Sequence, residues 1–118
     1  MANPSTTKGK IVLVPFPFDD LSSTKVRPAV CLTNPVGQYD HIILAFITSK
    51  VPTQLMETDV VLDTNHPDFT SSGLRKASTI RLDHLITVRK SIIRRELGTL
   101  SSGTQDEIFQ KLCKLLSE

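Results

Sequence analysis

The stretch IILAFITS, residues 42–49, decides the fold of this chain. Its unbroken apolar run, 42–47, is far shorter than the roughly 18 residues that a membrane-spanning helix needs. Its content of Ile, Leu and Phe is typical of a buried strand. The strand ends at Thr48 and Ser49, so we expect these two hydroxyl side chains to be exposed and yet held on a rigid element.

Similar short runs, rich in Val, Ile and Leu, lie on both sides of this strand. They occupy residues 11–16, 29–33, 59–62 and 77–82. Turn-forming Pro, Gly, Asn, Asp and Ser separate them, as at 34–37,. Because no long helix fits between the early strands, we expect a mainly β chain with an antiparallel, strongly curved sheet.

The C-terminal region has a helical pattern instead. Thr104 and Glu107 have the spacing of a capping box,. Apolar residues follow with the helical period, at Ile108, Phe109, Leu112, Cys113, Leu115 and Leu116,. We expect this helix to pack its apolar face on the sheet. A shorter helical turn is expected at 91–97, with Ser91 as N-cap and Gly98 just past its end.

Length and composition indicate one folded domain, residues 1–118, with residues 1–7 expected to be mobile. Apolar residues make up 39% and charged residues 22% of the chain, which excludes the composition of a disordered protein,. No signal peptide or membrane span is visible, so we expect a cytoplasmic protein. Cys31 and Cys113 are expected to be buried thiols, and no metal site is expected because the histidines lie on separate segments.

Charge is concentrated in one segment. The net charge is only +2, but residues 75–95 carry seven Lys and Arg against a single acid, Asp83, a local charge of +6. Such a cluster favours a polyanionic partner. A solvated surface with scattered cations is an equally valid interpretation of the same pattern.

Three features could carry chemistry. Arg27 precedes Pro28, which favours an extended backbone and lets the guanidinium project from the end of a strand. Thr48 ends the long apolar strand. Arg81 and Asp83 lie two apart, so both are expected on one face. Each feature also has an ordinary explanation: a surface cation, a strand-ending hydroxyl and a same-face ion pair.

Four stretches together resemble the MazF/PemK family of bacterial toxins. They are KGKIVLVPFPF at 8–18, RPAV at 27–30, ITSK at 47–50 and STIRLD at 78–83, with Thr87 and Val88 after the last. The segment LGTLS at 97–101 and the amphipathic helix follow in the order typical of the family. The resemblance runs from Lys8 to the C-terminal helix.

The resemblance implies a small SH3-like curved antiparallel barrel with a C-terminal helix, and a homodimer that is neutralised by a cognate antitoxin. It also implies a sequence-selective endoribonuclease that cuts single-stranded RNA without a metal ion or cofactor, leaving a cyclic phosphate and a 5′-hydroxyl. The catalytic residues implied are Arg27, Thr48, Arg81 and Asp83. The RNA-binding residues implied are Ser49, Lys50, Phe18 and Arg89, and Phe18 could instead pack in the core.

The chain also departs from the family. Many relatives have an acidic residue at the position of Lys10, and some have a histidine in the loop that spans residues 17–26 here. Asp83 is expected to be a weak general base, because the neighbouring Arg81 lowers its pKa. Two alternative functions remain: a toxin of the same barrel fold that binds a topoisomerase, and a non-catalytic nucleic-acid-binding module.

Overall fold

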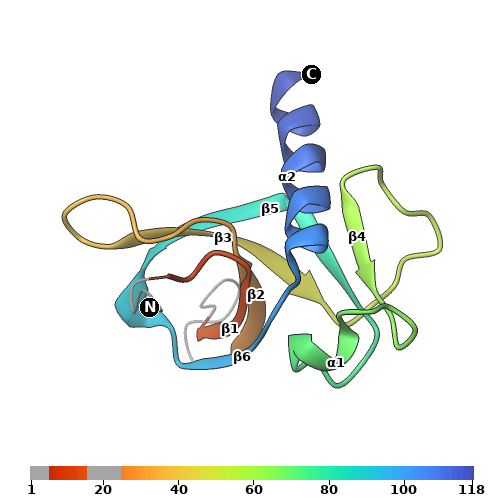
Figure 1. The fold of residues 1–118 in the computed structure, drawn as a ribbon, viewed down its shortest axis with the longest axis horizontal. Helices are drawn as coiled ribbons and strands as arrows, with labels where there is room; N and C mark the ends of the chain where they lie inside the picture. The colour runs from red at the N-terminus through yellow and green to blue at the C-terminus, as the bar shows by residue number, and fades with distance from the viewer. Residues whose placement is uncertain (1–5, 16–24) are drawn as a thin grey trace.

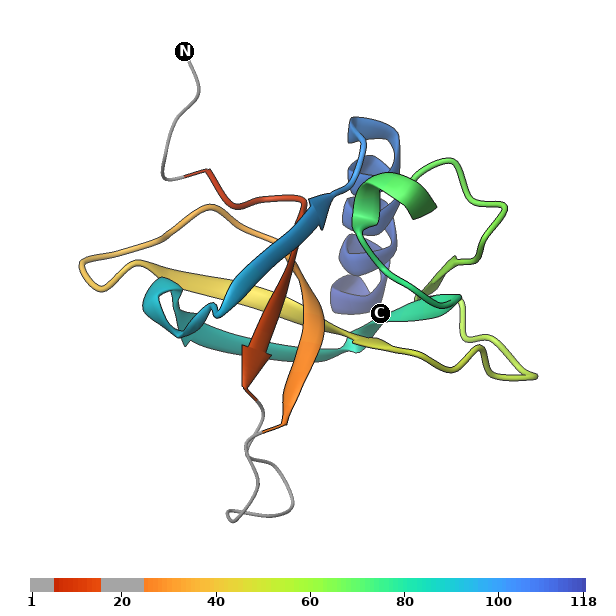
Figure 2. The ribbon, with the colours of Figure 1, turned by 90° about the horizontal axis from the view of Figure 1, so that it is seen from below.

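The computed structural model describes residues 6–15 and 25–118, and within them one sheet has the strand order β4-β5-β3-β2-β1-β6. The strands are β1 (Lys10–Pro15), β2 (Val26–Cys31), β3 (His41–Thr48), β4 (Asp59–Leu62), β5 (Ser78–Arg89) and β6 (Arg95–Thr99). Every neighbouring pair is antiparallel. The sheet curls into a half-barrel beside a C-terminal helix (Figures 1 and 2), which confirms the expected fold class.

Both faces of the sheet carry a hydrophobic core. The first core lies on the side of the C-terminal helix α2 (Ser102–Ser117), and we call that side the helix face; it includes Ile47, Ile80 and, from the helix, Ile108. The second core, on what we call the far face, consists of Val12, Val14, Ala29, Cys31, Ile42 and Leu44, with Phe46 packed against it. Alternate residues of β1, β2 and β3 therefore belong to different cores, as the pleat requires,.

Strand β5 bends sharply where its register against β3 changes. Ala45 pairs with Leu85, but the next residue, Phe46, pairs with Arg81. Residues 82–84 are therefore accommodated in a bulge, which bends a strand and increases its twist. The sequence predicted this strand only for 77–82, because the residues beyond the bulge no longer follow its alternation.

The expected helical turn at 91–97 is wrong. A short 3-10 helix, η1 (Lys90–Ile92), is followed by β6, which pairs with β1. Gly98 is not a helix cap: a Cβ there would overlap the backbone of Ser71 and Ser72. These residues belong to α1 (Phe69–Ser72), a short helix that the sequence did not predict. Close approach of α1 to β6, and not helix termination, therefore requires this glycine.

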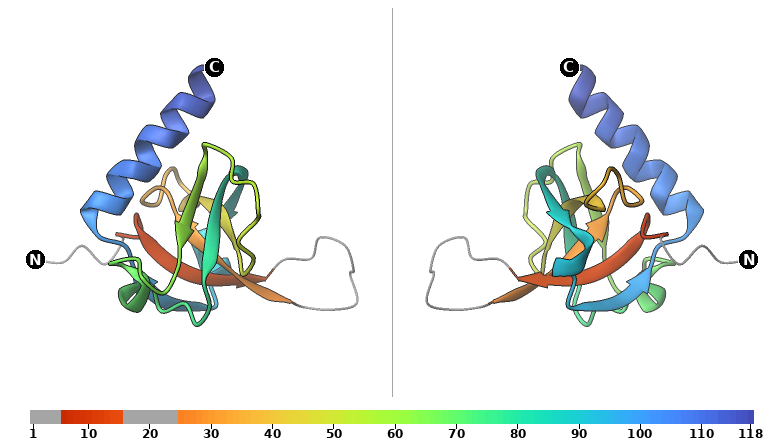
Figure 3. Two further views of the ribbon diagram at one scale, coloured as in Figure 1. Left: turned by 90° about the vertical axis from the view of Figure 1, so that its right-hand side faces the viewer. Right: turned by 90° about the vertical axis from the view of Figure 1, so that its left-hand side faces the viewer.

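Helix α2 starts earlier than expected, and the sheet covers less of its apolar face than expected. Its N-cap is Ser101, whose Oγ accepts the Thr104 N–H at 3.4 Å. Its C-terminal half extends beyond the strands (Figure 3), and Phe109 and Leu116 are 60% and 71% exposed. Cys113 is exposed too, so its expected burial is wrong. Cys31 is buried as expected, and burial raises the pKa of its thiol to about 12.

Candidate active site

Arg27 and Thr48 lie on the far face at one end of neighbouring strands. In the ladder between β2 and β3, Ala29 is opposite Phe46. Arg27 and Thr48 are each two residues further along, so they point to the same face as this pair. If the ladder continued at the same register, Arg27 would be opposite Thr48. Arg27 is exposed and lies within β2, where it pairs with Val14, so the extended conformation expected before Pro28 is confirmed.

The Thr48 hydroxyl is held at the exact end of β3, as expected from the sequence. Its Oγ1 accepts the backbone N–H of Lys50 at 3.3 Å. The carbonyl of Lys50 in turn accepts a hydrogen bond of 2.9 Å from the Thr79 hydroxyl, on the adjacent strand β5. Because accepting a hydrogen bond uses only a lone pair, the Thr48 hydroxyl can still donate its proton to an anionic oxygen.

Arg81, on β5, is directly across from Phe46 and therefore lies on the far face as well. Its Nε and Nη2 donate to Oδ1 and Oδ2 of Asp83 at 3.0 and 2.8 Å, which confirms the expected ion pair. The hydrogen bond from Arg81 is the largest influence on Asp83 and lowers the pKa of its carboxyl. The same bond raises the pKa of Arg81.

Sequence reasoning missed a second acid beside Arg81. Asp59, the first residue of β4, is opposite Arg81 in the β4–β5 ladder, and its Oδ1 lies 3.4 Å from the Arg81 Nε. Its side chain is only 2% exposed. The only signal in the sequence was a carboxylate at the start of an otherwise apolar strand.

His84 is also close to these residues. Its Nε2 lies 3.6 Å from Oδ2 of Asp83, and its side chain is 54% exposed. Among the residues that the structure describes, no three His, Cys, Asp or Glu side chains gather as ligands of a metal ion would. None of the described helices is long and apolar enough to cross a membrane.

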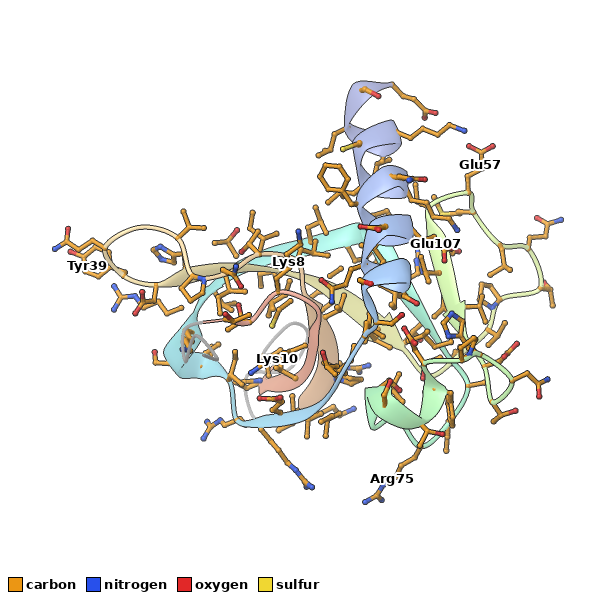
Figure 4. All side chains as sticks on the ribbon, in the orientation of Figure 1. Lys8, Lys10, Tyr39, Glu57, Arg75 and Glu107 are labelled. Atoms are coloured by element: carbon orange, nitrogen blue, oxygen red, sulfur yellow. The ribbon has the colours of Figure 1, made fainter. Side chains whose placement is uncertain are left out.

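The structure separates the remaining predicted residues. Ser49 and Lys50 are exposed and directly follow Thr48. Arg89 is at the other end of the β3–β5 ladder, opposite His41, with its guanidinium 4.7 Å from the centre of the Tyr39 ring. Tyr39 lies at the outer end of the loop between β2 and β3 (Figure 4). Arg89 is therefore not grouped with Arg27 and Thr48. Phe18 lies outside the described residues.

Solved structures of similar fold include toxins. The Mycobacterium tuberculosis toxin MazF-mt6 has a TM-score of 0.69 at 20% identity, over 92% of this chain and 96% of that chain. A mycobacterial endoribonuclease in complex with its cognate antitoxin has a TM-score of 0.69 at 14% identity, over 95% of each chain. A chain of a MazE–MazF crystal structure from Deinococcus radiodurans has a TM-score of 0.69 at 17% identity, over 96% of this chain and 97% of that chain.

At such identities these structures establish the fold alone. No curated protein sequence matches the chain. The family model of the PemK-like, MazF-like toxins of type II toxin–antitoxin systems matches residues 7–116, nearly the whole chain. Together with the half-barrel and its C-terminal helix, this match places the chain in that toxin family.

Proposed function

We propose that this toxin is an endoribonuclease that cleaves single-stranded RNA on the far face of its sheet. The observation that carries the proposal is the strand register, which brings Arg27, Thr48 and Arg81 to the same face at one end of three adjacent strands. A preformed group of a guanidinium, a hydroxyl and an arginine–carboxylate pair is suited to phosphoryl transfer within RNA. Membership of the MazF/PemK family supports the same activity.

In the proposed reaction, the ribose 2′-oxygen attacks the adjacent phosphorus and the 5′-oxygen leaves. A 2′,3′-cyclic phosphate and a 5′-hydroxyl result, so no water and no cofactor is consumed. Negative charge builds up on the non-bridging oxygens in the transition state. Arg27 and the Thr48 hydroxyl would donate hydrogen bonds to these oxygens, and a guanidinium is suited to this role because it can donate two parallel bonds.

Two protons must also move. The 2′-hydroxyl loses one, and the leaving 5′-oxygen gains one. Asp83 is the proposed acceptor of the first proton: Arg81 lowers its pKa, which keeps the carboxylate ionised but makes it a weak base,. Stabilisation of charge by Arg27 is therefore the larger proposed contribution, and proton transfer by Asp83 the smaller one.

We further propose a cognate antitoxin and a second copy of the chain as partners. Similar toxins have been solved with an antitoxin bound. For the second copy we propose the exposed apolar side of α2 and the groove beside it, which has a volume of about 270 Å³. Its lining includes Leu32, Ile43, Leu85, Phe109, Leu112 and Leu116. Because this helix side and the groove adjoin, two copies related by a two-fold axis could each cover the helix side and groove of the other.

The decisive test is incubation of the purified protein with a long single-stranded RNA in excess EDTA, followed by analysis of the fragment ends. We expect cutting to cyclic phosphate and 5′-hydroxyl ends. Intact RNA, both with EDTA and with added divalent metal, would contradict the endoribonuclease proposal. Cutting that requires added metal would contradict only the metal-independent chemistry.

A further inference from the structure

The carboxylate of Asp59 is buried and is oriented toward Arg81. Oδ2 of Asp59 accepts the backbone N–H of Met56 at 3.0 Å. Oδ1 has no hydrogen-bond partner among the described residues, and it lies 3.4 Å from the Arg81 Nε. Burial of an ionised carboxylate is unfavourable unless a cation compensates for it. Arg81, which itself is 29% exposed, is the cation that does so.

We infer that Asp59 is a positioning residue, which holds the Arg81 guanidinium so that Arg81 in turn holds Asp83 at the reacting hydroxyl; this inference rests on the proposed endoribonuclease activity. Arg81 contacts Asp83 on its own strand and Asp59 on the neighbouring strand. A planar guanidinium that is held by two carboxylates from different strands loses its rotational freedom. Asp83, bound through both oxygens, is then fixed as well.

The inference also assigns the phosphate-binding cation. Asp59, Arg81 and Asp83 together carry one positive and two negative charges, so this cluster offers no net positive charge to RNA. Arg27, on the same face, is then the group that binds the phosphate. Removal of the Asp59 charge should therefore slow the chemical step without weakening the binding of RNA.

A purely structural role of Asp59 predicts a different outcome, and the chain offers a control for it. Lys111 of α2 donates a hydrogen bond of 2.8 Å to the backbone carbonyl of Asp59 and also pairs with Glu107, on the side of the helix that faces β4 (Figure 4). Lys111→Met removes this link between helix and strand but leaves the carboxylate of Asp59 and its contact with Arg81 in place.

The experiment compares wild type, Asp59→Asn and Lys111→Met on an RNA oligonucleotide that contains a mapped cleavage site. Single-turnover rates measure the chemical step. Dissociation constants are measured with the same oligonucleotide carrying a 2′-deoxy sugar at the cleavage site, which cannot react. For Asp59→Asn we expect a rate about 10- to 100-fold lower, the typical cost of a displaced catalytic group, with binding unchanged or tighter. Lys111→Met should react at the wild-type rate.

If Asp59→Asn fails to fold, Arg81→Lys replaces it, since an ammonium keeps the charge but cannot make the same two-sided contact. It should show the same loss of rate with binding retained. A wild-type rate in either folded variant would overturn the inference, and so would a parallel loss of rate and binding. If wild type itself leaves RNA intact, the proposed function fails together with the inference. If wild type cuts RNA and only the result for Asp59→Asn differs from the expected one, the inference fails and the proposed function stands.

Discussion

Arg81 and Asp83 lie two residues apart on β5 and meet through two parallel hydrogen bonds of 3.0 and 2.8 Å. Residues two apart in a regular strand point to the same face but are held apart by the extended backbone. Here Asp83 lies in the bulge at 82–84, where the strand bends and the two side chains can meet. The bulge thus places an ionised carboxylate where Arg81 can hold it through both oxygens.

This ion pair predicts a pH dependence of stability. The pKa of Asp83 is lowered from its ordinary value of 3.8, mainly by the hydrogen bond from Arg81. Because the pKa of Asp83 is lower in the folded than in the unfolded protein, the pair stabilises the folded state at pH values above the pKa of the unfolded state. This contribution is lost as the pH falls through the pKa of the folded state. Asp83→Asn should therefore reduce the free energy of unfolding at pH 7 by about 0.5 kcal/mol, the size typical of an exposed pair.

Urea unfolding of wild type and Asp83→Asn at neutral pH, and again below the folded pKa of Asp83, checks this prediction. The difference between the two proteins should vanish at the lower pH. His84→Gln is the control, because His84 is close to the same carboxylate at 3.6 Å but does not hold it. A difference that persists unchanged at low pH would show that the ion pair is not its source.

Replacement of Arg27 should abolish most of the activity. Arg27→Ala removes the proposed hydrogen-bond donor to the transition state, and loss of one such preorganised donor typically costs about 100- to 1,000-fold in rate. Because Arg27 is exposed, the free energy of unfolding of the Arg27→Ala protein should differ little from that of wild type,. Arg75→Ala removes the same charge from an exposed position that points away from the body of the protein (Figure 4). Equal RNA cleavage by the two variants would remove Arg27 from the active site.

The role of the Thr48 hydroxyl in RNA cleavage can be tested separately from that of the branched shape of the side chain. Thr48→Val keeps the branched side chain but loses both the proposed donor to phosphate and the acceptor of the Lys50 N–H. Thr48→Ser keeps the hydroxyl. We expect a rate of RNA cleavage about 10- to 100-fold lower for the valine variant, because a donor to the transition state is lost, and a nearly normal rate for serine. Equal rates for the two variants would argue against a role of the hydroxyl.

The surface proposed for the second copy predicts a variant that is a monomer. Phe109→Glu places a charge in the groove beside α2, where it would be desolvated on association,. Gln110→Glu adds the same charge at the next residue of the helix, which does not line the groove. Light scattering after gel filtration should find a monomer for the first variant and a dimer for the second and for wild type. A dimeric Phe109→Glu protein would place the interface elsewhere.

Local patterns were sufficient for some parts of this structure and not for others. The strand through residues 42–48 and its end at Thr48 follow from a run of apolar residues that stops at a hydroxyl. The sequence predicts a helical turn at 91–97, which the structure lacks, because Gly98 has the appearance of a residue that ends a helix. A glycine is needed at position 98 because the backbone of α1 lies against it, although α1 is far away along the chain. The predicted burial of Cys113 was wrong because the helical period does not show how much of a helix the sheet covers.

The sequence by itself determined that the chain is mainly β with a C-terminal helix, because periodicity and strand ends are local properties. The choice of Arg27, Thr48, Arg81 and Asp83 came from the resemblance of the sequence to the MazF/PemK family. Only the tertiary structure decided which of the predicted residues gather on the far face and which, like Arg89, lie elsewhere. It alone placed Asp59 against Arg81. The physical reason is that these contacts depend on the register between strands that are distant in sequence, and a shift of one residue would turn each side chain to the opposite face.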